Sequence, residues 1–285
     1  MSDATTRRTA LVTGASSGIG MATARKLADL GFVVYAAARR VERMKELEAQ
    51  GIRPIAMDVT DDASAAAGVD RIIADTGRID VLVNNAGYGS YGAIEDVPPE
   101  EARRQFDVNI FGLARLTQLV TPHMREQGDG YIVNVSSMGG KLYMPLGGWY
   151  HATKFAVEGL SDSLRLELAP FGIKVVIIEP GAIETEWGGI AADALLERSG
   201  SGAYADSARR VAKALTSEAS GPFRGSSPEV VANAIGRAVR AKHPRSRYAI
   251  GAGAKPATYA RRLLPDPVYD RGVRFLVSAA GRRRD

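Results

Sequence analysis

Residues 9–20 read TALVTGASSGIG, an apolar run that leads directly into three closely spaced glycines. The apolar run predicts a short buried strand, and the periodic pattern that begins at Ile19 predicts a helix straight after the glycines. A glycine turn at this place lets a backbone approach a pyrophosphate, and the helix N-terminus then offers free N–H groups. A purely structural turn would read the same way, so the interpretation depends on the rest of the chain.

Apolar, β-rich runs alternate with helical patterns along most of the 285 residues. Runs such as FVVYAA and VVII are continuously apolar, which is typical of strands covered on both faces in a parallel sheet. The alternation therefore predicts a doubly wound α/β fold without a linker that would divide the chain. The predicted strands are Thr9–Thr13, Phe32–Ala37, Arg53–Met57, Ile79–Val83, Tyr131–Val135, Ile173–Ile178 and Arg247–Ile250. The clearest predicted helices are Ile19–Leu30, Val41–Ala49, Glu100–Gln127 and Tyr150–Ala169.

Composition excludes several classes of protein. The chain has no cysteine, which rules out disulfides, thiolate metal sites, iron–sulfur clusters and a cysteine nucleophile. Its three histidines are scattered, so we predict no metal site. No apolar run reaches the ~18 residues of a membrane-spanning helix, and residues 1–8 lack the apolar core of a secretory signal. These observations predict a cytoplasmic protein.

The formal net charge of +5 is unevenly distributed. Residues 237–285 hold 13 Lys or Arg and 3 Asp or Glu, whereas residues 1–236 hold 24 and 29. We predict a catalytic domain over 1–254 and a basic, amphipathic extension over 255–285. The extension could pack on the body, end in solvent, or rest on an anionic membrane surface. No motif that reads nucleic acid accompanies it, so we predict no nucleic-acid partner.

The end of the second predicted strand indicates which dinucleotide the glycine turn would bind. An NAD site places an acidic side chain there for the ribose hydroxyl, whereas an arginine accommodates the 2′-phosphate of NADP. Here Ala38 stands at the acidic position, and Arg39 and Arg40 follow it. The pattern favours NADP(H) over NAD(H). The alternative is that the two arginines simply begin a solvated helix.

A tyrosine and a lysine four positions apart are candidates for proton transfer. Tyr150 and Lys154 would lie on one face of a predicted helix, one turn from each other. A cation beside a phenol lowers its pKa, and such a tyrosine can exchange a proton with an alcohol or a ketone. Alone, this spacing often arises by chance, so it needs the motifs around it.

Six motifs in the same order carry a family resemblance. They are TGASSGIG at 13–20, DVT at 58–60, NNAG at 84–87, Asn109, Ser136-Ser137 followed by Y-x-x-x-K at 150–154, and PG at 180–181. Over about residues 7–251 the chain resembles the classical group of the short-chain dehydrogenase/reductase family. The resemblance implies one Rossmann-type domain with seven parallel strands in the order 3-2-1-4-5-6-7. It also implies an enzyme that interconverts a ketone or aldehyde and an alcohol by hydride transfer.

The resemblance assigns roles to four catalytic residues. Tyr150 would be the general acid in reduction and the base in oxidation. Lys154 would lower the pKa of Tyr150 and hold the nicotinamide ribose. Ser137, thirteen residues before the tyrosine, would bind the substrate oxygen, and Asn109 would hold a water that links Lys154 to solvent.

The implied cofactor site gathers residues from the ends of the predicted strands. Besides Tyr150 and Lys154, its members are Gly14, Ser16, Ser17, Gly18, Ile19, Gly20, Arg39, Arg40, Asp58, Val59, Asn85, Ala86, Gly87, Pro180, Gly181, Ile183 and Thr185.

The substrate would be chosen by residues 139–149 and by a lid at about 184–225, which has weak helical patterning. Aromatic and aliphatic residues there favour an apolar carbonyl or alcohol, and residues 150–160 with Arg39 look most similar to the steroid- and retinoid-type branch. By resemblance, the long helices would form a homodimer or homotetramer. The alternative is a non-catalytic dinucleotide-binding sensor or scaffold, because a fold does not fix a function.

Overall fold

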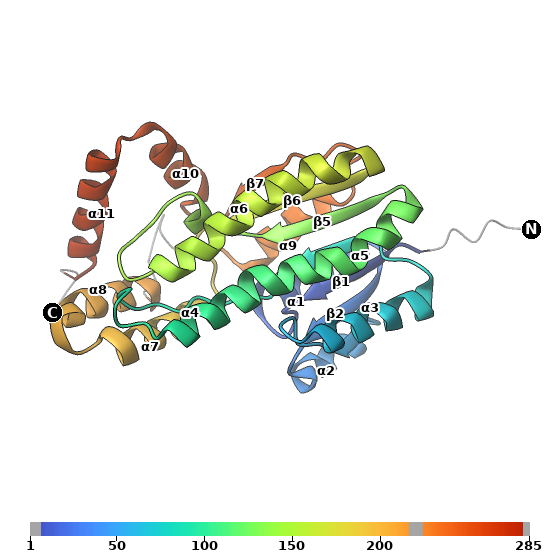
Figure 1. The fold of residues 1–285 in the computed structure, drawn as a ribbon, viewed down its shortest axis with the longest axis horizontal. Coiled ribbons are helices and arrows are strands. Elements are labelled where there is room, and N and C mark those ends of the chain that lie inside the picture. Colours follow the sequence, from blue (N-terminus) through green and yellow to red (C-terminus); the bar gives the residue numbers. More distant parts are fainter. Residues whose placement is uncertain (1–6, 217–224, 282–285) are drawn as a thin grey trace, which may run out of the picture.

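In a computed structural model, residues 7–216 and 225–281 are described. Seven parallel strands form one sheet in the order β3-β2-β1-β4-β5-β6-β7, which confirms the predicted Rossmann-type single domain (Figure 1). The strands are β1 (Thr9–Thr13), β2 (Val33–Ala38), β3 (Arg53–Ala56), β4 (Val81–Asn84), β5 (Gly130–Val135), β6 (Ile173–Pro180) and β7 (Arg247–Ile250). The strand order reverses between β1 and β4, and ligands bind such sheets at the carboxyl ends of strands beside this reversal.

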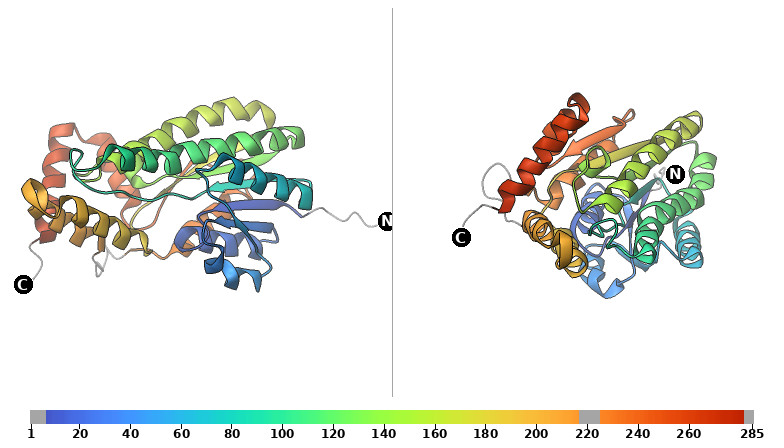
Figure 2. Two further views of the ribbon diagram at one scale, coloured as in Figure 1. Left: turned by 60° about the horizontal axis from the view of Figure 1, so that its bottom comes forward. Right: turned by 60° about the vertical axis from the view of Figure 1, so that its left-hand side comes forward.

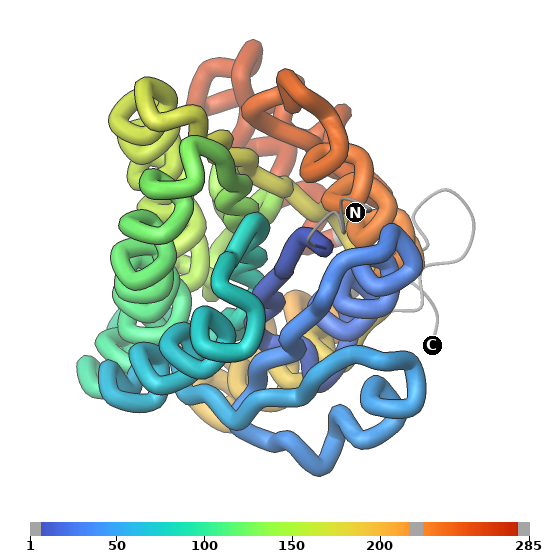
Figure 3. The backbone as a smooth tube through the Cα atoms, turned by 90° about the vertical axis from the view of Figure 1, so that its right-hand side faces the viewer, coloured from blue at the N-terminus to red at the C-terminus, as the bar shows by residue number. Residues whose placement is uncertain are grey.

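Helices cover both faces of the sheet (Figure 3). On one face lie α1 (Gly18–Asp29), α2 (Lys45–Glu48) and α9 (Pro228–Ala238), and on the other lie α3 (Asp62–Thr76), α5 (Leu113–Gln127) and α6 (Gly148–Leu168). Along β1, Ala10 and Val12 enter the core on the α1 face while Leu11 enters the core on the α6 face. Both faces are therefore buried, which explains why the strands read as continuous apolar runs.

Two predicted helices differ from the observed ones. The helix predicted over Glu100–Gln127 consists of α4 (Pro99–Phe106), a π-helical turn at Asp107–Gly112, and α5. The segment predicted as Val41–Ala49 starts as a 3-10 turn, Val41–Met44, before the short α2. Apolar periodicity detects helical segments but does not distinguish these local changes of winding.

The predicted lid is more helical than its sequence pattern indicates. It contains α7 (Trp187–Ser199) and α8 (Ala205–Thr216), which pack on each other through Ala191, Ala192, Ala208 and Ala212. Alanine has high helix propensity but gives a weak apolar signal, which explains the faint pattern of α7, whereas α8 has a clear amphipathic pattern that sequence reasoning missed. Residues 217–224 of the predicted lid and 282–285 of the predicted extension lie outside the described residues.

The chain continues past β7 into α10 (Ala254–Leu263) and α11 (Asp266–Gly281). Two further views show α7, α8, α10 and α11 gathered at the end of the molecule opposite the N-terminus (Figure 2). The carboxyl ends of the strands point toward this end (Figure 1). Among the described helices, none is long and apolar enough to cross a membrane.

Candidate active site

The glycine turn leaves the backbone no room for side chains. Gly14 and Gly18 adopt positive φ angles of 64° and 51°. A Cβ atom at Gly20 would lie 2.3 Å from the carbonyl oxygen of Gly14. Ser17 is the N-cap residue of α1, and its hydroxyl makes no capping bond there. The glycine loop therefore leads into α1 without side chains in the way, and Ile19 lies in the first turn of the helix. The Ser17 hydroxyl makes no hydrogen bond to the helix, so it is available to a ligand.

Thr13, which we did not predict as a site residue, connects this loop to the end of β4. Its hydroxyl donates to the carbonyl oxygen of Val83 at 3.2 Å and accepts the N–H groups of Asn85 and Ala86, each at 3.0 Å. The side-chain amide of Asn85 in turn donates to the Thr13 carbonyl oxygen at 2.9 Å. The first residue of the TGASSGIG motif was the available signal for this role.

A pocket of about 490 Å³ lies in front of the N-terminus of α1. The predicted residues Ser16, Ser17, Gly18 and Thr185 line it, and the Thr185 methyl group lies directly over Gly18. Arg25 and Arg43 line it as well, and sequence reasoning missed both. Arg43 forms an ion pair with Glu186 at 3.1 Å, so two segments far apart in the chain meet across the pocket.

Arg39 and Arg40 follow β2 and are exposed at its carboxyl end. Nearby, the Asp58 carboxylate accepts hydrogen bonds from the Thr60 N–H at 3.0 Å and the Thr60 hydroxyl at 2.8 Å. Burial opposes ionisation of Asp58, but these bonds and the positive charge of Arg39 lower its pKa below the ordinary value. Val59 packs against the core on the α6 face. The ends of β2 and β3 thus bring the Arg39 guanidinium close to the Asp58 carboxylate.

The remaining predicted cofactor residues form the walls of the cleft at β4 and β6. A Cβ atom at Gly87 would lie 3.0 Å from Asn109 Oδ1 and 3.8 Å from Lys154 Nζ, so bare backbone faces the lysine. Gly181, after Pro180, is held by the Ile250 carbonyl oxygen at 2.8 Å. Ile183 pairs with Ser226 in an isolated bridge.

Helix α6 presents Tyr150 and Lys154 on one buried face, as their spacing predicts. The two residues are 7% and 8% exposed. Lys154 Nζ donates to the Val135 carbonyl oxygen at 2.9 Å and lies 5.9 Å from the centre of the Tyr150 ring. Ser137, two residues after β5, lies close enough to Tyr150 for its hydroxyl to act on the Tyr150 pKa. The structure therefore brings Ser137, Tyr150 and Lys154 together from β5 and α6.

The pKa values of this group differ from the expectation drawn from spacing alone. Burial raises the pKa of Tyr150 to about 12, and the Ser137 hydroxyl opposes this only in part. Burial also lowers the pKa of Lys154 to about 8, against the effect of Glu158. Desolvation thus outweighs the attraction of a cation about one turn away. In the protein alone, Tyr150 is held in the protonated form that a proton donor needs.

Asn109 lies inside the π-helical turn between α4 and α5. Its amide nitrogen donates to the Tyr88 carbonyl oxygen and to the Thr153 hydroxyl, each at 3.0 Å, and its Oδ1 accepts the Tyr88 N–H at 3.1 Å. The extra residue of such a turn redirects a side chain out of the regular helical array, and these turns are frequent at functional sites. Asn109 is thereby aimed at Gly87 and Lys154 from the opposite wall.

Aromatic rings enclose Tyr150, and one of them was missed by sequence reasoning. The ring centre of Tyr150 lies 5.8 Å from that of Tyr91 and 5.1 Å from that of Trp187. Tyr91 and Trp187 meet edge to face at 5.9 Å. Tyr91 stands in a loop without a motif, so only the folded chain brings it to the site.

His151 has a structural role in the loop after Ser137. Its Nε2 accepts the Met144 N–H at 3.1 Å, which leaves Nδ1 to donate to the Gly139 carbonyl oxygen at 3.0 Å. Burial lowers its pKa, so the neutral ring fits this arrangement. The Gly139 N–H in turn donates to the Ser137 hydroxyl oxygen at 3.0 Å. His151 therefore fixes the loop that orients Ser137.

A known family accounts for this fold and this grouping of residues. The model of the short chain dehydrogenase family matches residues 8–193. The chain belongs to the short-chain dehydrogenase family. A 3-ketodihydrosphingosine reductase from Bacteroides thetaiotaomicron is 40% identical, over 85% of this chain and 87% of that reductase. An NADPH-dependent 3-dehydrocapnine reductase from Ornithobacterium rhinotracheale is 35% identical, over 93% and 95%.

Solved structures agree with this assignment. A short-chain dehydrogenase from Streptomyces avermitilis superposes with a TM-score of 0.76 at 34% identity, over 98% of this chain and 99% of that one. A metagenomic short-chain oxidoreductase in complex with NADP superposes with a TM-score of 0.66 at 29% identity, over 85% and 95%. This short-chain dehydrogenase is therefore an oxidoreductase of a family that binds nicotinamide dinucleotides.

The residues present fit such a dinucleotide. The space that Cβ atoms would fill at Gly14 and Gly20 is closed by backbone atoms and the Asn85 amide, so only glycine lets this loop pack tightly at the N-terminus of α1, where free N–H groups suit a pyrophosphate. The pocket beside it carries Arg25 and Arg43, which suit phosphate charge. At the other end, bare backbone at Gly87 faces Lys154. The loop at the N-terminus of α1 and the region between Gly87 and Lys154 together suit a long ligand with negative charge near its middle.

Proposed function

We propose that this short-chain dehydrogenase is an NADP(H)-dependent oxidoreductase that interconverts an apolar ketone or aldehyde and the corresponding alcohol. The observation that carries this proposal is the buried meeting of Ser137, Tyr150 and Lys154 beside the glycine backbone at Gly87. A module that only bound a dinucleotide would need no proton donor at this place.

When bound, the nicotinamide cofactor supplies or accepts the hydride at the carbon of the substrate carbonyl. In reduction, Ser137 and Tyr150 donate hydrogen bonds to the carbonyl oxygen, where negative charge develops as the C–O double bond becomes single. Tyr150 then gives its proton to that oxygen, which yields the alcohol and a tyrosinate. The positive charge of Lys154 stabilises the tyrosinate until a proton returns, with Asn109 lining the route. In oxidation Tyr150 acts as the base.

Preference for NADP(H) is supported by Arg39 and Arg40, which stand where an NAD site carries an acidic residue. Arg39 also lies near enough to Asp58 to lower its pKa, which supports a role for its charge at the adenosine end of the cleft. One relative is named as NADPH-dependent, and one structural neighbour was solved with NADP. NAD(H) remains the alternative cofactor.

An apolar substrate is supported by the rings of Tyr91 and Trp187, which enclose Tyr150. They belong to a third apolar cluster, with Leu146 and Leu195, that borders the site away from the sheet. The names of two relatives describe reduction of 3-keto and 3-dehydro compounds, which agrees with a carbonyl as the reacting group. A steroid- or retinoid-type substrate and a cytoplasmic location both stay predictions from the sequence.

The decisive experiment replaces Tyr150 with Phe, which removes one hydroxyl and keeps the ring. Turnover of an apolar ketone with NADPH should fall by about 10²–10⁴-fold because the proton donor is gone. NADPH binding, followed by fluorescence titration, should change little. As a matched control, Tyr259→Phe alters a tyrosine that is 64% exposed on α10, and turnover should persist. If Tyr150→Phe kept full turnover, the protein would act by another mechanism or serve as a sensor.

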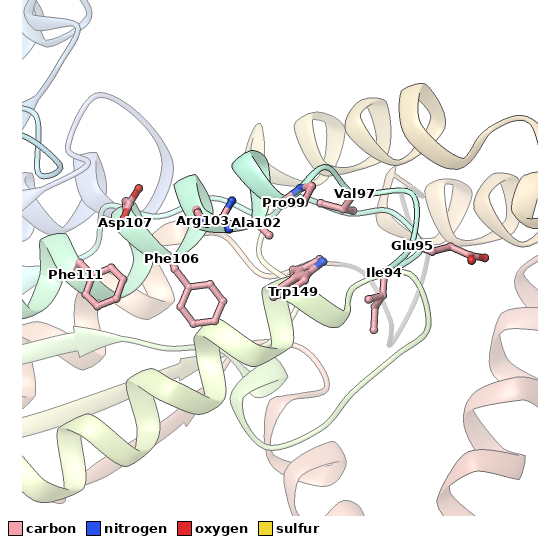
Figure 4. A pocket seen from close by; sticks show the side chains of 10 residues that line it. All are labelled: Ile94, Glu95, Val97, Pro99, Ala102, Arg103, Phe106, Asp107, Phe111 and Trp149. Carbon is pink, nitrogen blue, oxygen red and sulfur yellow. The ribbon is translucent and has the colours of Figure 1, made fainter.

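We also propose a homodimer or homotetramer. An apolar pocket of about 650 Å³ opens between α4, the following turn and the start of α6, with Phe106 and Trp149 in its wall (Figure 4). Phe111, which also lines the pocket, is 62% exposed, and farther along α6 Phe155 and Leu166 are 46% and 68% exposed. Apolar surface of this kind is typical of subunit interfaces. Light scattering of the purified chain measures the assembly directly.

Contact with an anionic membrane surface is the further partner that we propose. On α10 and α11, Leu263, Phe275 and Leu276 are 78%, 71% and 66% exposed. Exposed arginines stand among them, including Arg262, Arg271 and Arg274, whereas the two acidic side chains of α11 bind Arg261 and Tyr143. Interspersed apolar and basic side chains suit helices that lie in the headgroup region.

A further inference from the structure

A cluster of charged side chains lies buried behind the active site and is not used by the reaction proposed above. Glu158 on α6 is 3% exposed, and Glu179 near the end of β6 is 4% exposed. Tyr150, Lys154 and Glu158 follow one another at four-residue spacing, so they form one stripe along α6. Glu158 is therefore the next charge along the helix after the catalytic lysine.

Two cations face these two glutamates from other elements. Lys141, in the loop after Ser137, places its Nζ 2.8 Å from Glu158 Oε2. Arg247, on β7, places its Nε 3.0 Å from the same oxygen and 3.5 Å from Glu179 Oε1. Arg247 also binds Asp162 at 2.5 Å. Asp162 is paired with Arg165 as well, at 3.3 Å, so Lys141 and Arg247 are left to face Glu158 and Glu179.

Each of the two glutamates has one carboxyl oxygen without a hydrogen bond. Oε1 of Glu158 and Oε1 of Glu179 are buried, and neither has a hydrogen-bond partner among the described residues. The two carboxyl groups themselves lie within hydrogen-bond reach of each other. Two ionised carboxylates in contact repel, and neither can donate to the other. A single proton placed between them would give each of these oxygens a partner and remove the repulsion between the two carboxylates.

We propose that Glu158 and Glu179 share one proton in the resting protein, and that this pair positions the charge of Lys154 and the loop after Ser137. The proposal rests on the reductase function proposed above. Loss of the shared proton adds a negative charge one helical turn from Lys154, which favours the charged form of the lysine. It also sets Glu158 and Glu179 in repulsion and so disturbs the Lys141 contact that fixes the loop.

The electrostatics of the site place this proton loss in the neutral range. Burial raises the pKa of Glu179 to about 7, and the negative charge of Glu158 acts in the same direction. The positive charges of Lys141 and Arg247 oppose the rise. These are the charged groups that face Glu179 from α6, the loop after η3 (Met138–Gly140) and β7, and Asp162 acts on it only through Arg247.

The test compares Glu179→Gln with Asp162→Asn in the full chain. The glutamine stays neutral at every pH, and its amide can donate to Glu158. The asparagine, on α6, removes an equal charge from the same arginine, Arg247, but from a side chain that is 40% exposed. Infrared difference spectroscopy, without substrate, detects the carbonyl band of a protonated buried carboxyl group. The band should titrate near pH 7 in the parent protein and in Asp162→Asn, and should be lost in Glu179→Gln.

The pH profile of kcat for ketone reduction supplies the functional readout. We expect an inflection near pH 7 in the parent protein and in Asp162→Asn, and its loss in Glu179→Gln. If Glu179→Gln does not fold, Glu158→Gln replaces it, because removing the like charge should lower the pKa of Glu179 and so move the titration of the band to lower pH. A parent protein without a titrating band, or a band that persists in the glutamine variant, would overturn the shared proton. Because the infrared readout needs no turnover, failure of the reductase proposal is seen separately, as absent activity with the band still present.

Discussion

The two apolar cores on the faces of the sheet differ from the third apolar cluster, around Tyr150, in the kind of side chains and segments that form them. The sheet cores consist of long, branched side chains from consecutive strands and helices, among them Leu11, Val12, Val133 and Ile178. The third cluster joins Tyr91, Tyr150 and Trp187 to the alanine-rich α7 and α8 and to Val277 of α11. Local sequence patterns therefore mark the strands and helices of the sheet cores, whereas contacts between distant segments assemble the third cluster. Tyr150 belongs to the third cluster, although its helix packs on the sheet.

The largest effect on cofactor binding should come from a change in the glycine turn, which has the clearest local sequence pattern. In Gly20→Ala the new methyl group meets the Gly14 carbonyl oxygen, so the loop must shift, at a cost of about 1–3 kcal/mol. Binding of NADPH and NADH should weaken together, by roughly tenfold or more. Gly31→Ala is the control, since Gly31 has positive φ but no atom within 4 Å of a new Cβ. Fluorescence titration measures both, and equal affinities for the two variants would contradict the close-packed loop.

An intermediate effect should separate the two cofactors. Arg39→Ala removes a guanidinium that would pair with the 2′-phosphate, so the affinity for NADPH should fall by roughly tenfold while that for NADH is unchanged. Arg71→Ala removes an exposed arginine from α3 and should leave both affinities alone. Calorimetric titration of each variant with each cofactor provides the measurement. Equal weakening of both cofactors would assign Arg39 to general steering of charge rather than to the phosphate.

The smallest effect should appear on the outer side of the third cluster. Val277 of α11 packs into the cluster, while its neighbour Leu276 is 66% exposed. Leu276→Asp should reduce co-sedimentation with anionic vesicles severalfold without lowering the unfolding temperature. Leu166→Asp, on α6, removes an equally exposed leucine and should not change vesicle binding. No loss of binding in Leu276→Asp would favour packing between copies of the chain instead.

Much of the fold and many candidate residues could be predicted from the chain alone. The bounds of β1 and β7 agree with the predicted ones, and the remaining strands shift by one or two residues at their ends. The Tyr150–Lys154 stripe needed only helical periodicity. By contrast, Tyr91 stands in a loop without a motif, and Arg43 meets Glu186 across 143 positions of chain. No local pattern records such encounters.

The pKa of Tyr150 shows most clearly how the folded structure differs from what the sequence alone predicts. Sequence spacing places Lys154 one turn away and predicts a lowered pKa, but burial under Trp187 and Tyr91 raises it to about 12. The sequence by itself determined the strands, the glycine turn and the shared helix face of Tyr150 and Lys154, because these depend on short-range geometry, while the strand order followed from the family resemblance. Only the tertiary structure decided how far Tyr150 and Lys154 are buried from water and which charged side chains lie near them. Desolvation and the Glu158–Glu179 contact depend on segments that meet solely in the folded chain.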